Sequence, residues 1–269
     1  MDADASTKQT TLHQLLPLSG AGREVARSQD EASLVALYRE GTGWAERSRW
    51  LRCNMVSTID GAAMGSDGLS GSISGKADKR VFSVLRSVAD AVVVGSGTIN
   101  AERYTLLSAK PAHRQQRLDA GQDVVPTLVI VSSRANVDLD HLLSAGSSPL
   151  VVLTSATADR KRLDAIRDRA GSDSVLPVGD ESVDLRRGLD ALAERGLVQL
   201  LSEGGPRTLT AFAREGLLDE LDLTLSPRLS GGNAGRILDG YPLDTRLAQH
   251  TLLTGDDALI GRWLTLRDR

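Results

Sequence analysis

The chain has 269 residues, of which 41% are hydrophobic and 25% are charged, and its formal net charge is −3. This composition is typical of a globular protein with a sizeable core, and the charge balance excludes the basic excess expected of a nucleic-acid-binding domain. The sequence has no apolar run of about 20 residues and therefore predicts no membrane-spanning helix. The first ten residues, MDADASTKQT, lack the pattern of a signal peptide, so we expect a cytoplasmic protein.

The single cysteine, Cys53, excludes an internal disulfide and any zinc site built from several cysteines. With only four scattered histidines, the sequence predicts no metal site.

Two parts are expected: a polar lead segment at residues 1–45 and a single domain at residues 46–269. The lead contains the apolar stretch LHQLLPL and a candidate helix at Glu31–Arg39.

A strand is predicted from Trp50, ending at Asp60-Gly61. The next element, Lys76–Val88, is predicted as an amphipathic helix because its apolar residues recur at helical spacing: Val81, Val84, Leu85 and Val88. The run Ala91–Val94 is almost wholly apolar, as is typical of a strand buried on both faces of a sheet.

Strands and helices continue to alternate in the second half, after a polar, basic loop at Ser108–Pro126. The strand at Glu220–Leu225 alternates Leu with Asp or Thr and is expected to be half-exposed. This alternation predicts a three-layer α/β fold, with helices on both faces of a mostly parallel sheet and antiparallel strands added at the C-terminus. The further elements expected are strands at Leu128–Val131, Leu150–Leu153, Leu197–Leu201 and Leu259–Leu266, and helices at Ala158–Ala170, Leu185–Arg195 and Thr208–Glu215.

The first candidate site is the turn Gly95-Ser96-Gly97, where a buried strand runs into a helical turn expected to start at Thr98. Glycines let the backbone approach a ligand closely, and the N–H groups at a helix start attract phosphate. The third glycine of a Rossmann fingerprint is absent, because Asn100 stands there. A tight structural turn is the alternative interpretation.

The second candidate site is Ser202-Glu203-Gly204-Gly205-Pro206, again between a strand and a helix. Pro206 suits the first turn of a helix, and the Thr208 hydroxyl adds a polar group beside the N–H groups. Glu203 lies at the carboxyl end of its strand, the edge at which open α/β sheets bind ligands. Together, two such turns suit a dinucleotide, although each alone is also compatible with a structural turn.

Beyond these turns, the order of short motifs resembles the reductase domain of riboflavin biosynthesis, which has a dihydrofolate-reductase-like fold. The resemblance runs from about Trp50 to the C-terminus. Its motifs are Ser57-Thr58-Ile59-Asp60-Gly61, Ser74-Gly75 before a helix ending in Leu85-Arg86, Ala89 through Thr98, and Glu203-Gly204-Gly205-Pro206.

This resemblance implies an oxidoreductase that uses NADPH to reduce the ribosyl group of 5-amino-6-ribosylaminouracil 5′-phosphate to ribityl. It implies homodimers, for which Glu220–Leu225 is a candidate pairing strand. The N-terminal zinc deaminase of bifunctional members is not expected, because the sequence has neither His-x-Glu nor Pro-Cys-x-x-Cys. The alternatives are a reductase of another substrate such as dihydrofolate, and a cofactor-binding module without turnover.

The resemblance, together with the two turns, assigns the candidate site residues. Asp60 and Glu203 are the candidate catalytic carboxylates, although a turn aspartate and a structural carboxylate are the alternatives. Arg207 and the basic loop at Lys110–Arg117 are candidates for the 2′-phosphate of NADPH. The expected cofactor contacts are Thr58, Gly95, Gly97, Thr98, Glu102, Ser132, Gly204, Gly205, Pro206, Arg207, Thr208 and Leu209, and the expected substrate contacts are Asn54, Ser70, Arg86 and Glu203.

Overall fold

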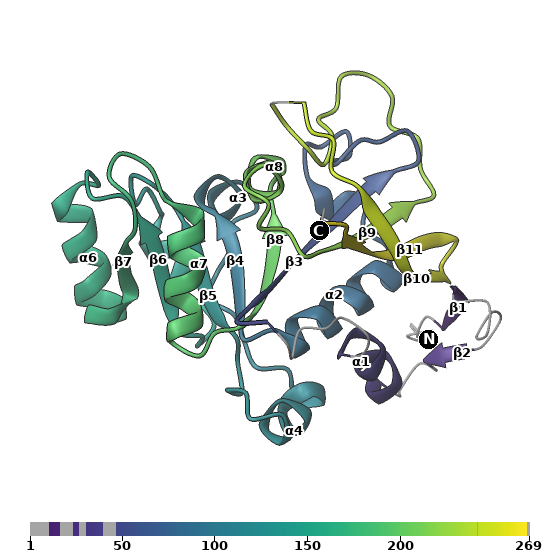
Figure 1. The fold of residues 1–269 in the computed structure, drawn as a ribbon, viewed down its shortest axis with the longest axis horizontal. Coiled ribbons are helices and arrows are strands. Elements are labelled where there is room, and N and C mark those ends of the chain that lie inside the picture. The colour runs from purple at the N-terminus through teal and green to yellow at the C-terminus, as the bar shows by residue number, and fades with distance from the viewer. Residues whose placement is uncertain (1–10, 17–23, 27–30, 40–46, 241, 268–269) are drawn as a thin grey trace, which may run out of the picture.

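The computed structural model describes residues 11–16, 24–26, 31–39, 47–240 and 242–267. Within this part of the chain, eleven strands form one sheet in the order β2-β1-β10-β11-β9-β3-β8-β4-β5-β6-β7. In Figure 1, β4–β7 lie at the left of the molecule, whereas β9, β10 and β11 lie at the right. The expected mostly parallel sheet is therefore present, with antiparallel strands added on one side.

Seven strands make up the parallel part of the sheet. β3 is the second strand of this part and pairs in parallel with β9 on one side and with β8 on the other. From β8 the parallel pairing continues through β4, β5 and β6 to β7. The bounds are β3 Trp50–Thr58, β4 Ala91–Gly95, β5 Thr127–Val131, β6 Leu150–Thr154, β7 Val175–Pro177, β8 Gln199–Gly204 and β9 Glu220–Ser226.

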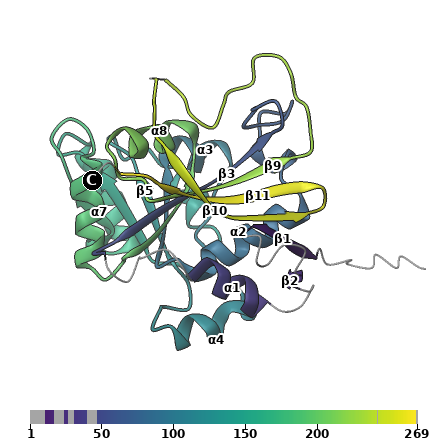
Figure 2. The ribbon, with the colours of Figure 1, turned by 45° about the vertical axis from the view of Figure 1, so that its right-hand side comes forward.

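The antiparallel part joins the two ends of the chain. β11 (Ala258–Thr265) pairs with β9 and with β10 (Leu247–Gly255), and Figure 2 shows β10 and β11 as a long hairpin. β10 also pairs with β1 (Leu12–Leu16), which in turn pairs with β2 (Glu24–Ala26). The sequence did not predict β10.

Helices cover both faces of the sheet, as expected. On one face, α2 (Lys76–Val88) buries the apolar stripe that includes Val81 and Leu85. Each such side chain contributes about 1.5–3 kcal/mol when fully buried. α6 (Arg160–Ala170) shares that core, and α7 (Leu185–Glu194) and α8 (Pro206–Arg214) cover the opposite face. The other helices are α3 Ser96–Ala101, α4 Pro111–Asp119, α5 Leu139–Leu142, η3 Ser70–Ser72 and η4 Ser172–Ser174.

Parts of the lead segment pack against this core. Leu12 of β1 is fully buried, as are Leu34 and Tyr38 of α1 (Glu31–Arg39), which lies beside α2. The predicted helix at Glu31–Arg39 is confirmed. Residues 1–10, 17–23, 27–30 and 40–46 lie outside the described residues, and the division at residue 45 stays a prediction.

The structure corrects the expectation for β9. This strand is hydrogen-bonded on both sides, by β3 and β11, and its polar residues Glu220, Asp222 and Thr224 are at most 2% exposed. It is therefore neither half-exposed nor available to pair across a two-fold axis. The buried Glu220 carboxylate forms ion pairs with Arg262 on β11 at 2.9 Å and with Arg52 on β3 at 3.3 Å, and Arg262 also lies 4.0 Å from the Asp222 carboxylate.

The basic stretch at Ser108–Pro126 also differs from the loop that the sequence predicts. It contains α4, whose His113 and Arg117 are only 5% and 2% exposed. The Arg117 guanidinium donates hydrogen bonds to the carbonyl oxygens of Ala89 at 2.6 Å and Asp123 at 2.7 Å. Arg117 thus anchors the segment after α2 and is occupied by backbone carbonyls.

No helix in the described residues is long and apolar enough to cross a membrane. The same residues contain no group of three or more His, Cys, Asp or Glu side chains arranged to hold a metal ion.

Candidate active site

A cleft of about 790 Å³ opens at the carboxyl edge of the parallel strands. Asn54 of β3, Gly95 at the end of β4 and Glu203 near the end of β8 all line it. This is the edge at which open α/β sheets bind ligands, because the strand-to-helix turns meet there. The sequence thus predicted the position of the cleft.

The two glycine turns contact each other in this cleft. Gly95 is the N-cap of α3, and Gly205 is the N-cap of α8. A Cβ on Gly95 would lie 2.6 Å from the Thr208 hydroxyl oxygen, and a Cβ on Gly205 would lie 2.5 Å from that of Thr98. Gly95 therefore leaves room for Thr208, and Gly205 leaves room for Thr98. A larger residue at either position would separate the two turns.

The two helix starts remain available to a ligand. Within the described residues, neither α3 nor α8 has a side-chain hydrogen bond at its N-cap. α3 begins at Ser96, two residues earlier than expected, so Gly97 lies in its first turn and lines the cleft. A Cβ on Gly97 would meet no atom within 4 Å, which shows open space beside the backbone there. First-turn N–H groups beside open space favour a bound anion.

Glu203 is held in a fixed orientation by two neighbours. Its side chain is 1% exposed, and both its oxygens accept hydrogen bonds from the Arg86 guanidinium, each at 2.5 Å. The Tyr104 hydroxyl donates to the same carboxylate at 3.0 Å, and the Arg86 guanidinium lies over the Phe82 ring, 4.4 Å from its centroid. Bidentate pairing of this kind fixes geometry as well as charge.

The charges within this group act on one another. Burial raises the pKa of Tyr104 well above its usual range, and the Glu203 carboxylate raises it further, so the phenol stays protonated. Burial alone would lower the pKa of Arg86, but Glu203 outweighs that effect and raises it. Glu203 thus lines the cleft with its carboxylate fixed in orientation by Arg86 and Tyr104.

Asp60 lies in a different setting from the one expected. Its carboxylate accepts hydrogen bonds from the Thr58 hydroxyl at 2.5 Å and from the N–H groups of Ser230 at 3.1 Å and Gly231 at 2.7 Å. The Thr58 hydroxyl and these two N–H groups lower the pKa of Asp60 to about 2. Neither Asp60 nor Thr58 is among the residues that line the cleft. Asp60 ties the turn after β3 to the loop after β9.

Other predicted residues fall into three groups. Ser70 and Glu102 both line the cleft and contact each other, since the Ser70 hydroxyl donates to Glu102 at 3.2 Å. Arg207 lines the cleft with a side chain that is 91% exposed and pairs with Asp239 at 3.2 Å. Ser132 and Leu209 do not line it: the Ser132 hydroxyl accepts the N–H of Asn136, and the Leu209 side chain belongs to the core under α8.

Several cleft residues were not predicted. Lys79 and Phe82 line the cleft from α2, and they share a helix face with Arg86 because the three are spaced three and four residues apart. That spacing was a usable signal once Arg86 was a candidate. Tyr104 lies just after α3, and Arg236 lies in the long loop after β9, where no periodic pattern points to a site.

Comparison with known proteins gives a consistent result. Residues 49–260 match the family described as the RibD C-terminal domain. A 2,5-diamino-6-ribosylamino-4(3H)-pyrimidinone 5′-phosphate reductase from Methanothermobacter thermautotrophicus is 31% identical over 192 residues, covering 71% of this chain and 84% of that protein. Riboflavin biosynthesis protein RibD from Chlamydia muridarum is 29% identical over 237 residues, which are 87% of this chain but only 60% of the relative's length.

A solved structure supports the fold. A pyrimidine reductase-like protein from Corynebacterium diphtheriae has a TM-score of 0.74 and 24% identity, with 86% of this chain and 98% of that chain covered. The family match extends from just before β3 into β11 and includes both glycine turns and the Arg86–Glu203 pair. The chain therefore belongs to the RibD C-terminal domain family.

Proposed function

We propose that this protein is a reductase that uses NADPH to convert the ribosyl group of 5-amino-6-ribosylaminouracil 5′-phosphate to ribityl. The observation that carries the proposal is the cleft, in which two helix starts without side-chain caps face the same space as the oriented Glu203 carboxylate. A dinucleotide and a polyhydroxylated substrate need these two features side by side.

The residues present fit a nicotinamide dinucleotide. The open space beside Gly97 and the paired turns around Gly95 and Gly205 form a cradle for phosphate groups. Arg207, exposed at the cleft, is the candidate for a 2′-phosphate and so for NADPH over NADH. The cofactor supplies the hydride, and the protein's task is to orient the reacting groups and limit access of water.

The substrate side of the cleft is assigned to polar groups on β3, η3 and β8. Glu203 would accept hydrogen bonds from substrate hydroxyl or amino groups, with Arg86 and Tyr104 acting through it as positioning residues. Asn54 and Ser70 also line this space. Further cations line the cleft, Lys79 from α2 and Arg236 from the loop after β9, and we assign the substrate phosphate to them.

A related substrate is the second candidate. Three relatives, 27–31% identical to this chain, are named as reductases of the 2,5-diamino-6-ribosylamino-4(3H)-pyrimidinone 5′-phosphate. The two pyrimidines both carry the ribosylamino phosphate that the cleft is proposed to hold. A buried carboxylate such as Glu203 is also compatible with a pterin ring, so dihydrofolate belongs in the same test.

The experiment is a steady-state assay of NADPH oxidation with each pyrimidine phosphate and with dihydrofolate, and with NADH in place of NADPH. We expect turnover with a ribosylaminopyrimidine phosphate and preference for NADPH. If only dihydrofolate is turned over, dihydrofolate is the substrate and the proposed pyrimidine is not. If NADPH binds but none of the three substrates is turned over, the protein is a cofactor-binding module without catalytic activity.

We propose a cytoplasmic homodimer as the working form. Since β9 is enclosed in the sheet, the interface must use another surface. Ile59 and Leu229 are 60% and 78% exposed, and the Ile59 N–H donates to the carbonyl oxygen of Arg228, so the two apolar side chains belong to neighbouring segments. Large exposed apolar side chains of this kind suit an isologous contact. Light scattering at micromolar concentration tests the dimer.

A further inference from the structure

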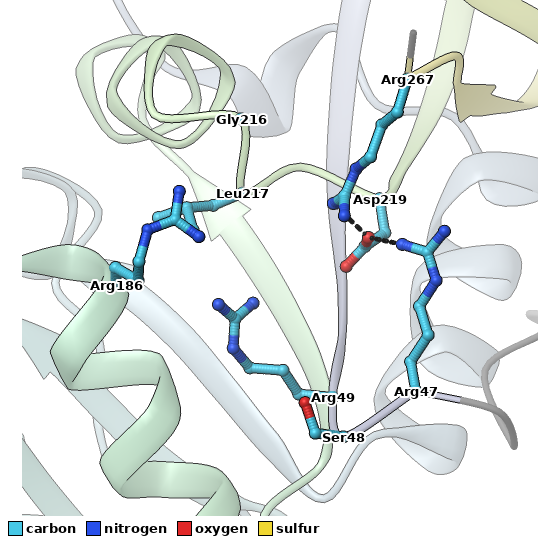
Figure 3. Close-up of a pocket in the computed structure, with 8 residues that line it drawn as sticks. All are labelled: Arg47, Ser48, Arg49, Arg186, Gly216, Leu217, Asp219 and Arg267. Carbon is cyan, nitrogen blue, oxygen red and sulfur yellow. Dashed lines mark hydrogen bonds and ion pairs between the residues drawn. The ribbon is translucent and has the colours of Figure 1, made fainter. Parts of the chain in front are cut away.

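A second pocket, of about 350 Å³, lies away from the cleft and is lined mainly by arginines (Figure 3). We call it the basic pocket. Its charged side chains are Arg47 and Arg49 just before β3, Arg186 at the start of α7, Arg267 just after β11, and Asp219 just before β9. Four separate segments thus bring four guanidinium groups and one carboxylate together.

The single lining carboxylate is already fully engaged. Asp219 accepts hydrogen bonds from Arg47 at 2.7 Å, from Arg267 at 2.6 Å and from the N–H of Leu51 at 2.8 Å. Its side chain is 2% exposed. Asp219 therefore fixes two of the arginines in place and anchors them to β3.

The other two arginines retain donors that face the pocket. Arg49 uses its Nε to bind Asp190 at 2.8 Å, and its side chain is 11% exposed. Among the described residues this is the only hydrogen bond of the Arg49 guanidinium, whose two terminal nitrogens point between Arg186 and Asp219 in Figure 3. Arg186 donates to the carbonyl oxygen of Glu215 at 2.7 Å and forms no ion pair with any described residue.

Four arginines are offset by Asp219 in the lining and by Asp190 beside Arg49, so two positive charges remain uncompensated at the pocket. Like charges held this close repel one another, and a bound anion removes that cost. The planar guanidinium fork matches the oxygens of a phosphoryl group, and a dianion offsets more of this charge than a monoanion does. We propose that the basic pocket is a binding site for the phosphoryl group of a small phosphorylated molecule.

This site is separate from the cleft. β3, β8 and β9 are parallel and begin at the edge where the basic pocket lies, whereas the cleft lies toward their carboxyl ends. Asn54 lies five positions after Arg49, which at about 3.3 Å per residue is roughly 16 Å along the strand. One phosphorylated ligand of ordinary size cannot place the same phosphate in both.

The test is calorimetric titration of the full chain with inorganic phosphate and with ribose 5-phosphate, in chloride buffer at constant ionic strength. Each titration is made in a Lys79→Gln, Arg236→Gln background saturated with NADPH, which removes the phosphate positions proposed for the cleft. The variants are Arg49→Gln and Arg186→Gln, which leave the Asp219 pairs intact. The matched control is Arg160→Gln, which removes the same charge from a side chain that is 93% exposed on α6. Thermal melts of each protein establish that it is folded.

We expect the wild type and R160Q to bind phosphate alike, and R49Q and R186Q to bind it about tenfold more weakly, the effect of losing one charge-assisted hydrogen bond. NADPH binding to R186Q should equal that of the wild type, which separates this site from the cleft. Tighter binding of ribose 5-phosphate would identify a phosphomonoester as the ligand, and equal binding would identify free phosphate. A phosphate signal that survives both substitutions, or no signal in the folded wild type, overturns the proposal.

Discussion

Replacing Gly97 by valine tests the cofactor cradle without disturbing the fold. A Cβ at this position meets nothing within 4 Å, and the backbone is outside the left-handed region, so the side chain enters open cleft space. The free energy of unfolding should stay within about 0.5 kcal/mol of the wild type, as for most substitutions away from packed atoms. If phosphate loses one or two charge-assisted hydrogen bonds, binding of NADPH weakens by about 1.5–3 kcal/mol, or roughly 10- to 150-fold.

Replacing Gly205 by valine should give a different result, although it faces the same cleft. Gly205 has φ +69°, and its Cβ would lie 2.5 Å from the Thr98 hydroxyl oxygen. The backbone conformation, with ψ 143°, costs about 1–3 kcal/mol for a residue other than glycine. In a chain of this size that lowers the Tm by roughly 2–12 °C, and the contact with Thr98 adds to the loss. Gly205→Val in a Thr98→Ala background should recover the contact part only.

Thermal melts of the apo proteins and calorimetric titration with NADPH measure both quantities. The expected pattern is a stable Gly97→Val variant with weak cofactor binding and a destabilised Gly205→Val variant. If Gly97→Val melts and binds NADPH like the wild type, the phosphates do not lie beside α3, and the cradle has been placed wrongly.

Four further outcomes are expected. Glu203→Gln should keep NADPH binding but lower kcat by about 100-fold or more, and a normal kcat would make this carboxylate purely structural. Arg86→Lys loses the bidentate pair, so KM for the pyrimidine should rise while affinity for NADPH is kept; an unchanged KM speaks against positioning through Glu203. The pKa of Asp60 is lowered to about 2, so the hydrogen bond from the Gly231 N–H to its carboxylate stabilises the protein above about pH 4 and is lost as the pH falls toward 2. Asp60→Asn should therefore lower the Tm at neutral pH but not at pH 2. If the Tm of the variant and of the wild type differ by the same amount at every pH, this explanation is wrong. Burial raises the pKa of Cys53 to about 12, so iodoacetamide should not label the folded protein in mass spectrometry at pH 8, and rapid labelling would disprove the burial.

The sequence predicted most of the parallel core because apolar runs and turn residues there agree. β4 and β5 read as continuous apolar stretches, and both are buried on two faces. The stripe on α2 has helical spacing, and the proline at the start of α8 marks that helix. In these elements the secondary structure that the local sequence favours is the one that the packed core requires.

The errors have a shared physical cause, which is the burial of polar side chains. In β9, Leu alternates with Glu, Asp and Thr, which is the usual pattern of a strand with one buried and one solvent-exposed face. Its polar face is instead covered by Arg52 and Arg262, which are 168 and 42 residues away from Glu220. No local pattern can show such partners. α4 was missed for the same reason, since its buried Arg117 looks like a solvated charge in the sequence.

At the site, the sequence predicted the groups but not the way they are connected. Glu203 and Arg86 were both candidate substrate contacts, yet they bind each other across 117 residues of chain. Asp60 was a candidate for the cleft because Asp-Gly follows a strand, and the alternative, a turn aspartate, describes its contacts better. Tyr104, which completes the Glu203 group, stands alone in an irregular segment and carries no sequence signal.

The partners of Glu203 explain why one carboxylate can serve a cleft that also holds phosphates. An isolated buried carboxylate would be costly and would repel a dinucleotide. Paired with Arg86, it is close to neutral as a unit while keeping directed acceptor oxygens, and Tyr104 fixes its orientation without adding charge. The two glycine turns can then attract an anion next to it. Because Arg86 neutralises Glu203, replacing Arg86 by an uncharged residue should lower the affinity for NADPH. Replacing Tyr104 should lower that affinity less.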